Sequence, residues 1–227
     1  MCKLMLRVPL LLHAGAASQL FPLLAAGLVR RGLKGPRGWV AAWCGVLVVG
    51  DMVQLALGLR DVNNHWVPYV TIPVAGVIIL LALAKWQERQ IPRLTFQVAV
   101  PLFLVTWGLL ALFVENPGTF STAADPVYSL LGLGAAVYTL VSRSADEPEP
   151  LARQDWFWIC GGLALYFGTA STLGPVAAFL LNEHPVLVIR AYEAKSATDV
   201  LAFLAIAKGI TCQPSPPQAS GASSSPA

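Results

Sequence analysis

The residues most able to do chemistry lie in one apolar stretch near the C-terminus, residues 187–210. The first half of this stretch contains Arg190, Glu193, Lys195 and Asp199. Arg190 and Glu193 are three positions apart, and Lys195 and Asp199 are four apart. On an α-helix, both spacings place the two side chains on one face, where opposite charges attract each other. We therefore predict two ion pairs on this helix.

A polar stripe accompanies these pairs, because Tyr192, Lys195, Ser196 and Asp199 recur at helical spacing. A charge at the centre of a membrane helix costs about 2.5–3.5 kcal/mol on insertion, so the stripe must face the bundle interior or a hydrated cavity. We predict a ligand-binding cavity lined by Asp51, Gln54, Tyr166, Tyr192, Glu193, Lys195 and Asp199. In the alternative interpretation, the same charges form ion pairs that only hold the helices together.

The sequence lacks the motifs that are typical of enzymes and metal sites. The chain has no HExxH, GxSxG, Walker or CxxC pattern. His13, His65 and His184 lack the spacing of metal ligands, and Cys44 and Cys160 lie in apolar runs where a cysteine behaves as a small hydrophobic residue. We predict no catalytic residue, no metal and no cofactor.

The amino-acid composition indicates that lipid, rather than water, surrounds much of this protein. Hydrophobic residues make up 56% of the chain and charged residues only 12%, against about 25% charged in an average soluble domain. The mean hydropathy is +0.64, so lipid must cover much of the surface. The net charge of +3 is small and scattered, which argues against a nucleic-acid partner.

Seven stretches approach the roughly 20 apolar residues that a spanning helix needs. They are Val8–Val29, Gly38–Gly58, Trp66–Ala84, Leu94–Val114, Pro126–Val141, Trp156–Leu181 and Leu187–Ile210. The predicted fold is all-α, a polytopic transmembrane bundle of seven helices within residues 1–211. Residues 212–227 are rich in Pro, Ser and Ala and are expected to form a disordered cytoplasmic tail.

The basic residues predict the orientation of this bundle. One side holds Arg30, Arg31, Lys34, Arg37, Lys85, Arg89, Arg93, Arg143, Arg153 and Lys208, and the other holds Lys3, Arg7 and Arg60. The positive-inside rule places the first group in the cytoplasm, so the N-terminus lies outside and the C-terminus inside. Most polar groups within the helices then fall in the outer half, and the inner half is comparatively apolar.

The N-terminal stretch allows a second interpretation. Lys3 and Arg7, an apolar run and the small residues 14–17 could form a cleaved secretory signal. The apolar run continues to Arg30, which is long enough to span, and we expect an uncleaved first helix. Cleavage would leave six helices with the same orientation.

Two short motifs carry a resemblance. They are residues 63–66, Asn-Asn-His-Trp, and residues 155–158, Asp-Trp-Phe-Trp, followed by Gly162 and residues 166–168, Tyr-Phe-Gly. In these motifs and in its hydropathy pattern, the chain resembles a group of small bacterial seven-helix membrane proteins without an established activity. The resemblance implies the inner (plasma) membrane of a bacterium and a layout similar to the membrane parts of bacterial sensors.

A lysine in the seventh helix is also found in microbial rhodopsins, where it binds retinal. The residues of this chain do not fit the rhodopsin pattern. An acidic residue would be needed at Ala191, and the third predicted helix has no acidic counter-ion. Retinal binding is therefore not expected.

Segments outside the apolar stretches are too short to form a catalytic or DNA-binding domain. We therefore expect a non-enzymatic bundle that senses or binds a small polar ligand from the outer side. It would pass a conformational change to a membrane or cytoplasmic signalling partner. The alternatives are a small transporter or ion-translocating protein, whose broken helices surround a site, and a structural subunit of a membrane complex.

Overall fold

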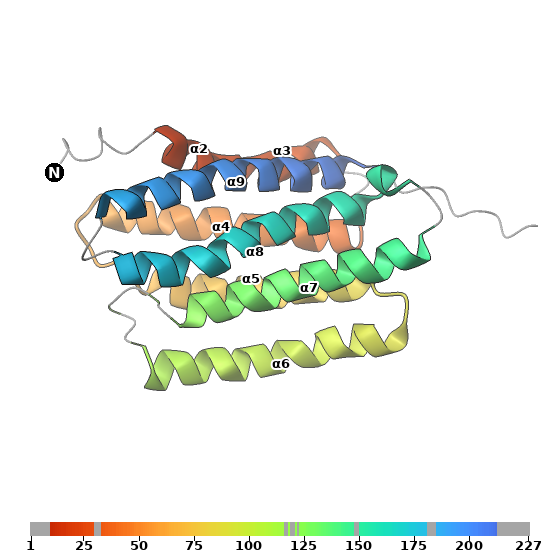
Figure 1. Cartoon of the computed structure of the whole chain (residues 1–227), viewed down its shortest axis with the longest axis horizontal. Coiled ribbons are helices and arrows are strands. Elements are labelled where there is room, and N and C mark those ends of the chain that lie inside the picture. The colour runs from red at the N-terminus through yellow and green to blue at the C-terminus, as the bar shows by residue number, and fades with distance from the viewer. Residues whose placement is uncertain are drawn as a thin grey trace, which may run out of the picture.

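The computed structural model describes residues 10–29, 33–115, 118, 121, 123–147, 150–180 and 185–212. Its elements are α2 (Leu10–Ser18), α3 (Leu20–Leu28), α4 (Pro36–Gly58), α5 (Val67–Trp86), α6 (Gln90–Phe113), α7 (Ala124–Asp146), the 3₁₀ helix η1 (Leu151–Arg153), α8 (Asp155–Leu180) and α9 (Pro185–Thr211) (Figure 1). Some residues of the sequence analysis lie outside the described part: Lys3, Arg7, Arg30, Arg31, His184 and the tail from residue 213.

Five segments are long and apolar enough to cross a membrane. They are Leu10–Leu28, Pro36–Gly58, Val67–Trp86, Gln90–Phe113 and Ala124–Ala145, with 19 to 24 residues each, and a hydrocarbon core of about 30 Å needs about 20. The predicted all-helical, multi-pass membrane architecture is confirmed at this level. α8 and α9, with 26 and 27 residues, lie beside these segments.

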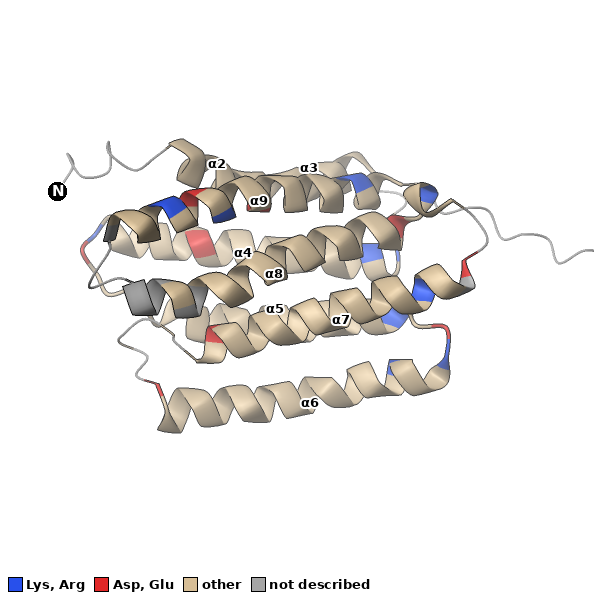
Figure 2. Ribbon diagram, in the orientation of Figure 1, with Lys and Arg blue, Asp and Glu red and all other residues tan. Residues whose placement is uncertain are grey.

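Successive long helices run in opposite directions along the bundle, so the described chain ends lie at opposite ends of it (Figure 1). We call these the Leu10 end and the Cys212 end. Most charges lie near the two ends, while α9 carries a group of charges in its first half (Figure 2).

The first and last segments of the bundle are neighbours, because α2 and α3 pack mainly against α9. Gly15 allows this approach: a Cβ there would lie 2.8 Å from the Cβ of Ser196. The most extensive helix contact joins α8 and α9, where a Cβ at Gly162 would lie 2.5 Å from the carbonyl oxygen of Ala202. Small residues that bring backbones together are a main source of helix association in membranes.

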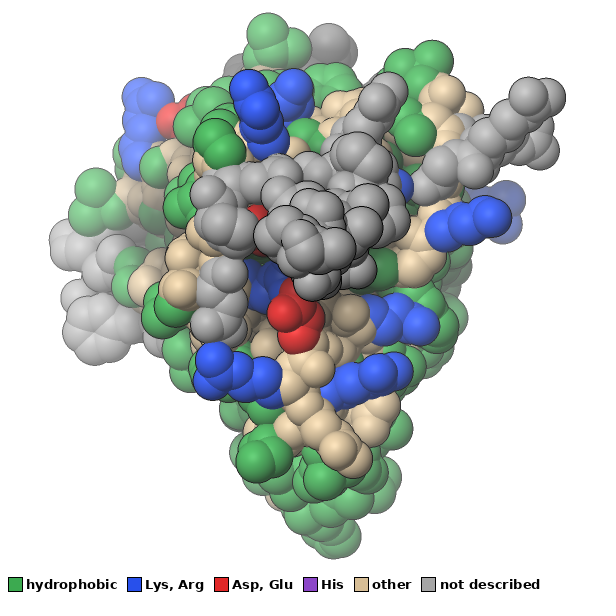
Figure 3. All heavy atoms as spheres, turned by 90° about the vertical axis from the view of Figure 1, so that its right-hand side faces the viewer, with side chains coloured by type: hydrophobic (Ala, Val, Ile, Leu, Met, Phe, Trp, Pro, Cys, Tyr) green, Lys and Arg blue, Asp and Glu red, His purple; other side chains and the backbone are tan. Residues whose placement is uncertain are grey.

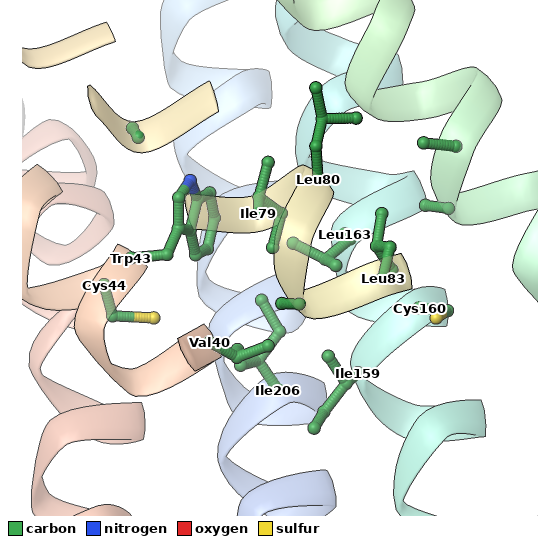
Figure 4. Packing of buried hydrophobic residues seen from close by; sticks show 14 of the residues in the cluster. Val40, Trp43, Cys44, Ile79, Leu80, Leu83, Ile159, Cys160, Leu163 and Ile206 are labelled. Carbon is green, nitrogen blue, oxygen red and sulfur yellow. The ribbon is translucent and has the colours of Figure 1, made fainter. Parts of the chain in front are cut away.

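A hydrophobic core fills the centre of the bundle, with side chains from α4, α5, α8 and α9 (Figure 4). Trp43 is fully buried there, and its indole N–H donates to the hydroxyl of Tyr128 at 2.9 Å. The rings of Trp43 and Phe203 stack at 6.2 Å. Cys44 and Cys160 are buried free thiols, which confirms their expected role as small hydrophobic residues.

A buried cation ties the helices together at the Cys212 end. Arg37, in the first turn of α4, is only 5% exposed. Its Nη1 donates to the carbonyl oxygens of Cys212 at 2.5 Å and Ile210 at 3.4 Å, and its Nε lies 3.6 Å from Asp155 Oδ2. Arg37 thus binds the last carbonyls of α9 and the start of α8; we call this the Arg37 cluster. Other Lys and Arg side chains surround this end of the molecule (Figure 3).

The structure differs from the predicted helices in two instructive places. The expected first helix forms one span, Leu10–Leu28, in which a turn at Gln19 separates α2 from α3 while the backbone of Gln19 keeps helical angles. The fifth predicted helix is longer than expected and spans Ala124–Asp146, because its last turns are helical although they are polar. α5 continues through Pro73, which lies inside it.

Candidate functional site

Lys195 of α9 is the centre of a polar cluster near the Leu10 end. Its Nζ donates to Asp199 Oδ2 at 2.5 Å and lies 5.1 Å from the ring centroid of Tyr166. The ion pair and the cation–π contact together stabilise an ammonium group in a poorly hydrated place. Arg190 Nη1 lies 2.8 Å from Glu193 Oε2, so both ion pairs predicted for this helix are confirmed.

The polar stripe of α9 faces the bundle interior, as predicted, since Ser196 and Asp199 are 7% and 8% exposed. Asp199 also retains hydrogen-bonding capacity. Its Oδ1 is buried and has no hydrogen-bond partner among the described residues, although an ionised carboxylate can accept several donors. A buried acceptor of this kind is costly to leave unpaired, so the cluster can accommodate one more donor.

Two further aspartates lie within electrostatic range of this lysine. The charges of Lys195 and Asp199 act on Asp51 of α4, and the charge of Lys195 acts on Asp125 in the first turn of α7. Tyr166 lies within range of all three carboxylates. One ammonium thus shares its surroundings with three acidic groups. We call these five residues the Lys195 cluster.

Asp125 was not among the predicted site residues. Pro126 was expected to begin the fifth helix, which left Asp125 in the preceding loop. The structure starts α7 at Ala124 and places Asp125 in its first turn. An acidic residue directly before a proline is a common helix start, and that signal could have included Asp125.

A groove of about 400 Å³ lies beside this cluster, between α2–α3 and α4. Its described lining consists of His13, Ala16, Ala17, Gln19, Leu20, Val48, Asp51, Met52, Gln54 and Leu55. Asp51 is exposed in this groove and accepts a hydrogen bond from Gln19 Nε2 at 2.8 Å. An apolar lining with a few polar groups is typical of sites for small ligands.

The groove opens along the side of the bundle. Met52 and Leu55 on its α4 wall are 56% and 50% exposed, and Leu20 on the other wall is 38% exposed. In a membrane-spanning bundle these side chains face lipid. The structure therefore gives a ligand a lateral approach to Asp51, through the apolar layer of the membrane.

The structure divides the predicted site residues among several places. Asp51 and Gln54 line the groove, whereas Lys195 of α9 contacts both Asp199 and Tyr166 of α8. Glu193 is compensated by Arg190, whose side chain is 74% exposed. Tyr192 lies within electrostatic range of Asp125. The groove and the buried ion pair are thus adjoining parts rather than one cavity lined by all seven residues.

Two other polar features at the Leu10 end have structural roles. Glu115 Oε1 accepts hydrogen bonds from the backbone N–H groups of Ala123 at 2.6 Å and Ala124 at 3.2 Å, which caps the start of α7. In the Asn-Asn-His-Trp motif, Asn64 donates to the carbonyl oxygen of Gln54 at 2.9 Å. This motif therefore fixes the loop after α4 and supports one wall of the groove.

Metal binding and similarity to known proteins give no further lead. Within the described ranges, no group of three or more His, Cys, Asp or Glu residues is placed to hold a metal ion. No protein-family model, curated protein or solved structure matches this chain. Its function must therefore be argued from the geometry of the site itself.

Proposed function

We propose that this protein binds a small molecule with a cationic group and an apolar body, in the groove between α2–α3 and α4. The observation that carries this proposal is the exposed carboxylate of Asp51 within an otherwise mostly apolar lining. In surroundings of low dielectric constant, a carboxylate attracts a cation more strongly than it does in water. The apolar body of the ligand would cover Leu20, Met52 and Leu55.

We also propose how the chain is arranged in the membrane. All seven long segments span the membrane, the N-terminus lies outside and the C-terminus lies in the cytoplasm. The Lys and Arg residues around the Cys212 end support this orientation. The groove then lies in the outer half, and the resemblance to sensor-like bacterial proteins favours the plasma membrane of a bacterium.

Binding at this groove has a route to the rest of the bundle. Gln19 occupies the break between α2 and α3 and donates to Asp51. A cationic ligand competes for that carboxylate, so Gln19 loses its acceptor and the junction of α2 and α3 loses its hydrogen bond to α4. Because α2 packs on α9 at Gly15 and Ser196, a displacement of this junction reaches α9. α9 leads to the Cys212 end, where a membrane or cytoplasmic partner would receive the signal, without any enzymatic step.

Transport is a second candidate, and one observation favours it. The first span has a one-residue turn at Gln19, between α2 and α3, and the side chain of Gln19 donates to Asp51. Interrupted helices beside a polar site within the membrane are typical of secondary transporters. In that case the same carboxylate would bind a cationic substrate or an ion during translocation.

Binding can be tested with tetraphenylphosphonium, an apolar cation, and tetraphenylborate, an anion of similar shape. Thermal unfolding of the protein in lipid nanodiscs is measured against the concentration of each. We expect stabilisation by the cation and at least tenfold weaker stabilisation after Asp51→Asn. Asp61→Asn is the matched control, because Asp61 is an exposed acid in a loop at the same end. Equal effects of the two ions, or unchanged binding by Asp51→Asn, would refute the proposal.

A flux measurement separates sensing from transport. Liposomes containing the protein are loaded with buffer, and uptake of tetraphenylphosphonium is compared with that of protein-free liposomes. A sensor binds the cation without accelerating uptake. Uptake that depends on Asp51 would establish the transport alternative.

A further inference from the structure

A second groove, apolar and separate from the Asp51 groove, lies between α6 and α7. It has a volume of about 380 Å³ and its floor includes Leu80 of α5 and Phe96 of α6. α6 packs mainly against α5 and makes only a small contact with α7, which leaves this groove beside it. The Thr95 hydroxyl in the lining donates to the carbonyl oxygen of Ile91 and is therefore already satisfied. The groove therefore presents a hydrocarbon-like surface.

The length of this groove matches one leaflet of a bilayer. Its lining runs from Ile91 to Ala99 in α6 and from Leu130 to Tyr138 in α7. Eight residues of α-helix extend over about 12 Å, and half of a hydrocarbon core is about 15 Å thick. The groove begins next to the first residue of α6, Gln90, and so lies in the leaflet at the Cys212 end.

The end of the groove is polar and basic. Pro92 and Tyr138 line both the apolar groove and an adjoining polar pocket of about 210 Å³. That pocket and the next one along the surface are lined by Glu88, Arg89, Arg93 and Arg143, among other residues. Three arginines against two glutamates, Glu88 and the adjoining Glu147, give this mouth a net positive charge. Arg143 pairs with both Glu88 and Glu147. The side chains of Arg89 and Arg93 are exposed at the rim.

We propose that this groove binds an anionic phospholipid. One acyl chain lies between α6 and α7 along Phe96, and the phosphate group lies at Arg89 and Arg93. The phenol of Tyr138, 47% exposed at the junction, faces the interfacial region of the lipid, where aromatic side chains with a polar tip are favoured. A basic rim next to a hydrophobic slot is complementary to an anionic lipid in both charge and shape.

Gly134 of α7 provides a direct test. It lines the groove, and a Cβ at this position would meet no atom within 4 Å. The Cβ of Gly134→Leu therefore meets no atom of the fold, and the rest of the side chain extends into the groove. Gly108→Leu is the matched control, because Gly108 of α6 is equally unobstructed and does not line the groove. Arg89→Gln combined with Arg93→Gln removes charge from the mouth and leaves the groove open.

Lipid binding is measured by native mass spectrometry on the full-length, delipidated protein titrated with phosphatidylglycerol or phosphatidylcholine. We expect at least fivefold tighter binding of phosphatidylglycerol, a loss of that preference in the double arginine variant, and weaker binding of both lipids in Gly134→Leu but not in Gly108→Leu. Thermal unfolding verifies that each variant is folded. Equal binding of the two lipids by the unchanged protein would overturn the proposal.

Two other outcomes would also overturn it. If Gly134→Leu and Gly108→Leu bind the same amount of lipid, the groove is not the site. If Gly134→Leu instead converts a dimer to a monomer, a second copy of the chain occupies the groove in place of lipid. Neither result bears on the Asp51 groove, which belongs to different helices.

Discussion

The Arg37 cluster and the Lys195 cluster place similar charges near opposite ends of the bundle, but they satisfy them differently. Arg37 is 5% exposed and meets two backbone carbonyl oxygens and the carboxylate of Asp155. Lys195 is more exposed, at 20% of its side chain, and makes one ion pair with Asp199. Oδ1 of Asp199 lacks a hydrogen-bond partner within the described chain. One cluster is saturated and the other is open.

The difference indicates which charges hold the fold together and which are available for a ligand. A cation that binds the last carbonyls of one helix and the start of another replaces hydrogen bonds that the backbone cannot make itself. An ion pair between two side chains does not replace such backbone hydrogen bonds. A protein with an apolar pair of similar volume in its place is often at least as stable. Substitutions can test this comparison directly.

Arg37→Ala should have the largest effect. It leaves the carboxylate of Asp155 and the carbonyl oxygens of Ile210 and Cys212 without their donor, and we expect a loss of about 3 kcal/mol in the free energy of unfolding. The measurement is reversible unfolding in mixed detergent micelles. Arg60→Ala, an exposed loop arginine, serves as the control. A loss no greater than that of the control would remove the distinction between the clusters.

Lys195→Met should cost about 2 kcal/mol in the same assay, because it leaves the Asp199 carboxylate buried and uncompensated. The double variant Lys195→Met with Asp199→Leu should recover most of this loss. The corresponding double variant at Arg37 and Asp155 should not recover, since the carbonyl oxygens of α9 still lack a donor. If stability recovers in both double variants, or in neither, the proposed difference between the two clusters is wrong.

Gly15→Ala tests the contact through which the open cluster would signal. Its new methyl group collides with Ser196, and we expect a loss of about 1–2 kcal/mol from overpacking. Gly161→Ala is the control, because a Cβ at Gly161 meets no atom within 4 Å. If both variants are equally stable, α2 does not depend on close packing against α9.

Asp51→Asn should have the smallest effect on stability, within about 0.5 kcal/mol. The side chain is exposed in the groove, and an asparagine can still accept the hydrogen bond from Gln19. Its effect should appear in cation binding instead. A loss of stability as large as that of Lys195→Met would show that Asp51 is a structural charge.

Hydropathy and helical spacing predicted much of this architecture. The long apolar runs became helices within a few residues of their expected ends, and the spacing of Lys195 and Asp199 predicted their ion pair. These features depend on residues close together in the sequence. The turn at Gln19 has a local signal in Pro22, which cannot donate a backbone hydrogen bond to the carbonyl oxygen of Ser18. The contact of Gln19 with Asp51, by contrast, comes from another helix, and no local pattern reveals it.

Burial at the Cys212 end was the least predictable feature. Arg37 was counted as a loop charge that sets the orientation, yet it is buried. Trp86 and Trp156, near the ends of their helices, are only 7% and 1% exposed. Buried polar contacts such as that of Gln87 with Thr139 at 3.0 Å were not expected in an inner half described as apolar. The sequence places a residue along a helix, whereas neighbouring helices decide which face is buried.

The contact between the first and last segments has a consequence for how this protein is made. α2 and α3 leave the ribosome first, but the helix that they mainly pack against, α9, is synthesised last. The N-terminal segment must therefore wait in the bilayer, with Asp51 of α4 as an early polar partner for Gln19, until the rest of the chain has been inserted. A ribosome that stops before α9 would release a chain whose first helix lacks its main docking surface, and quality-control proteases could recognise that exposed helix.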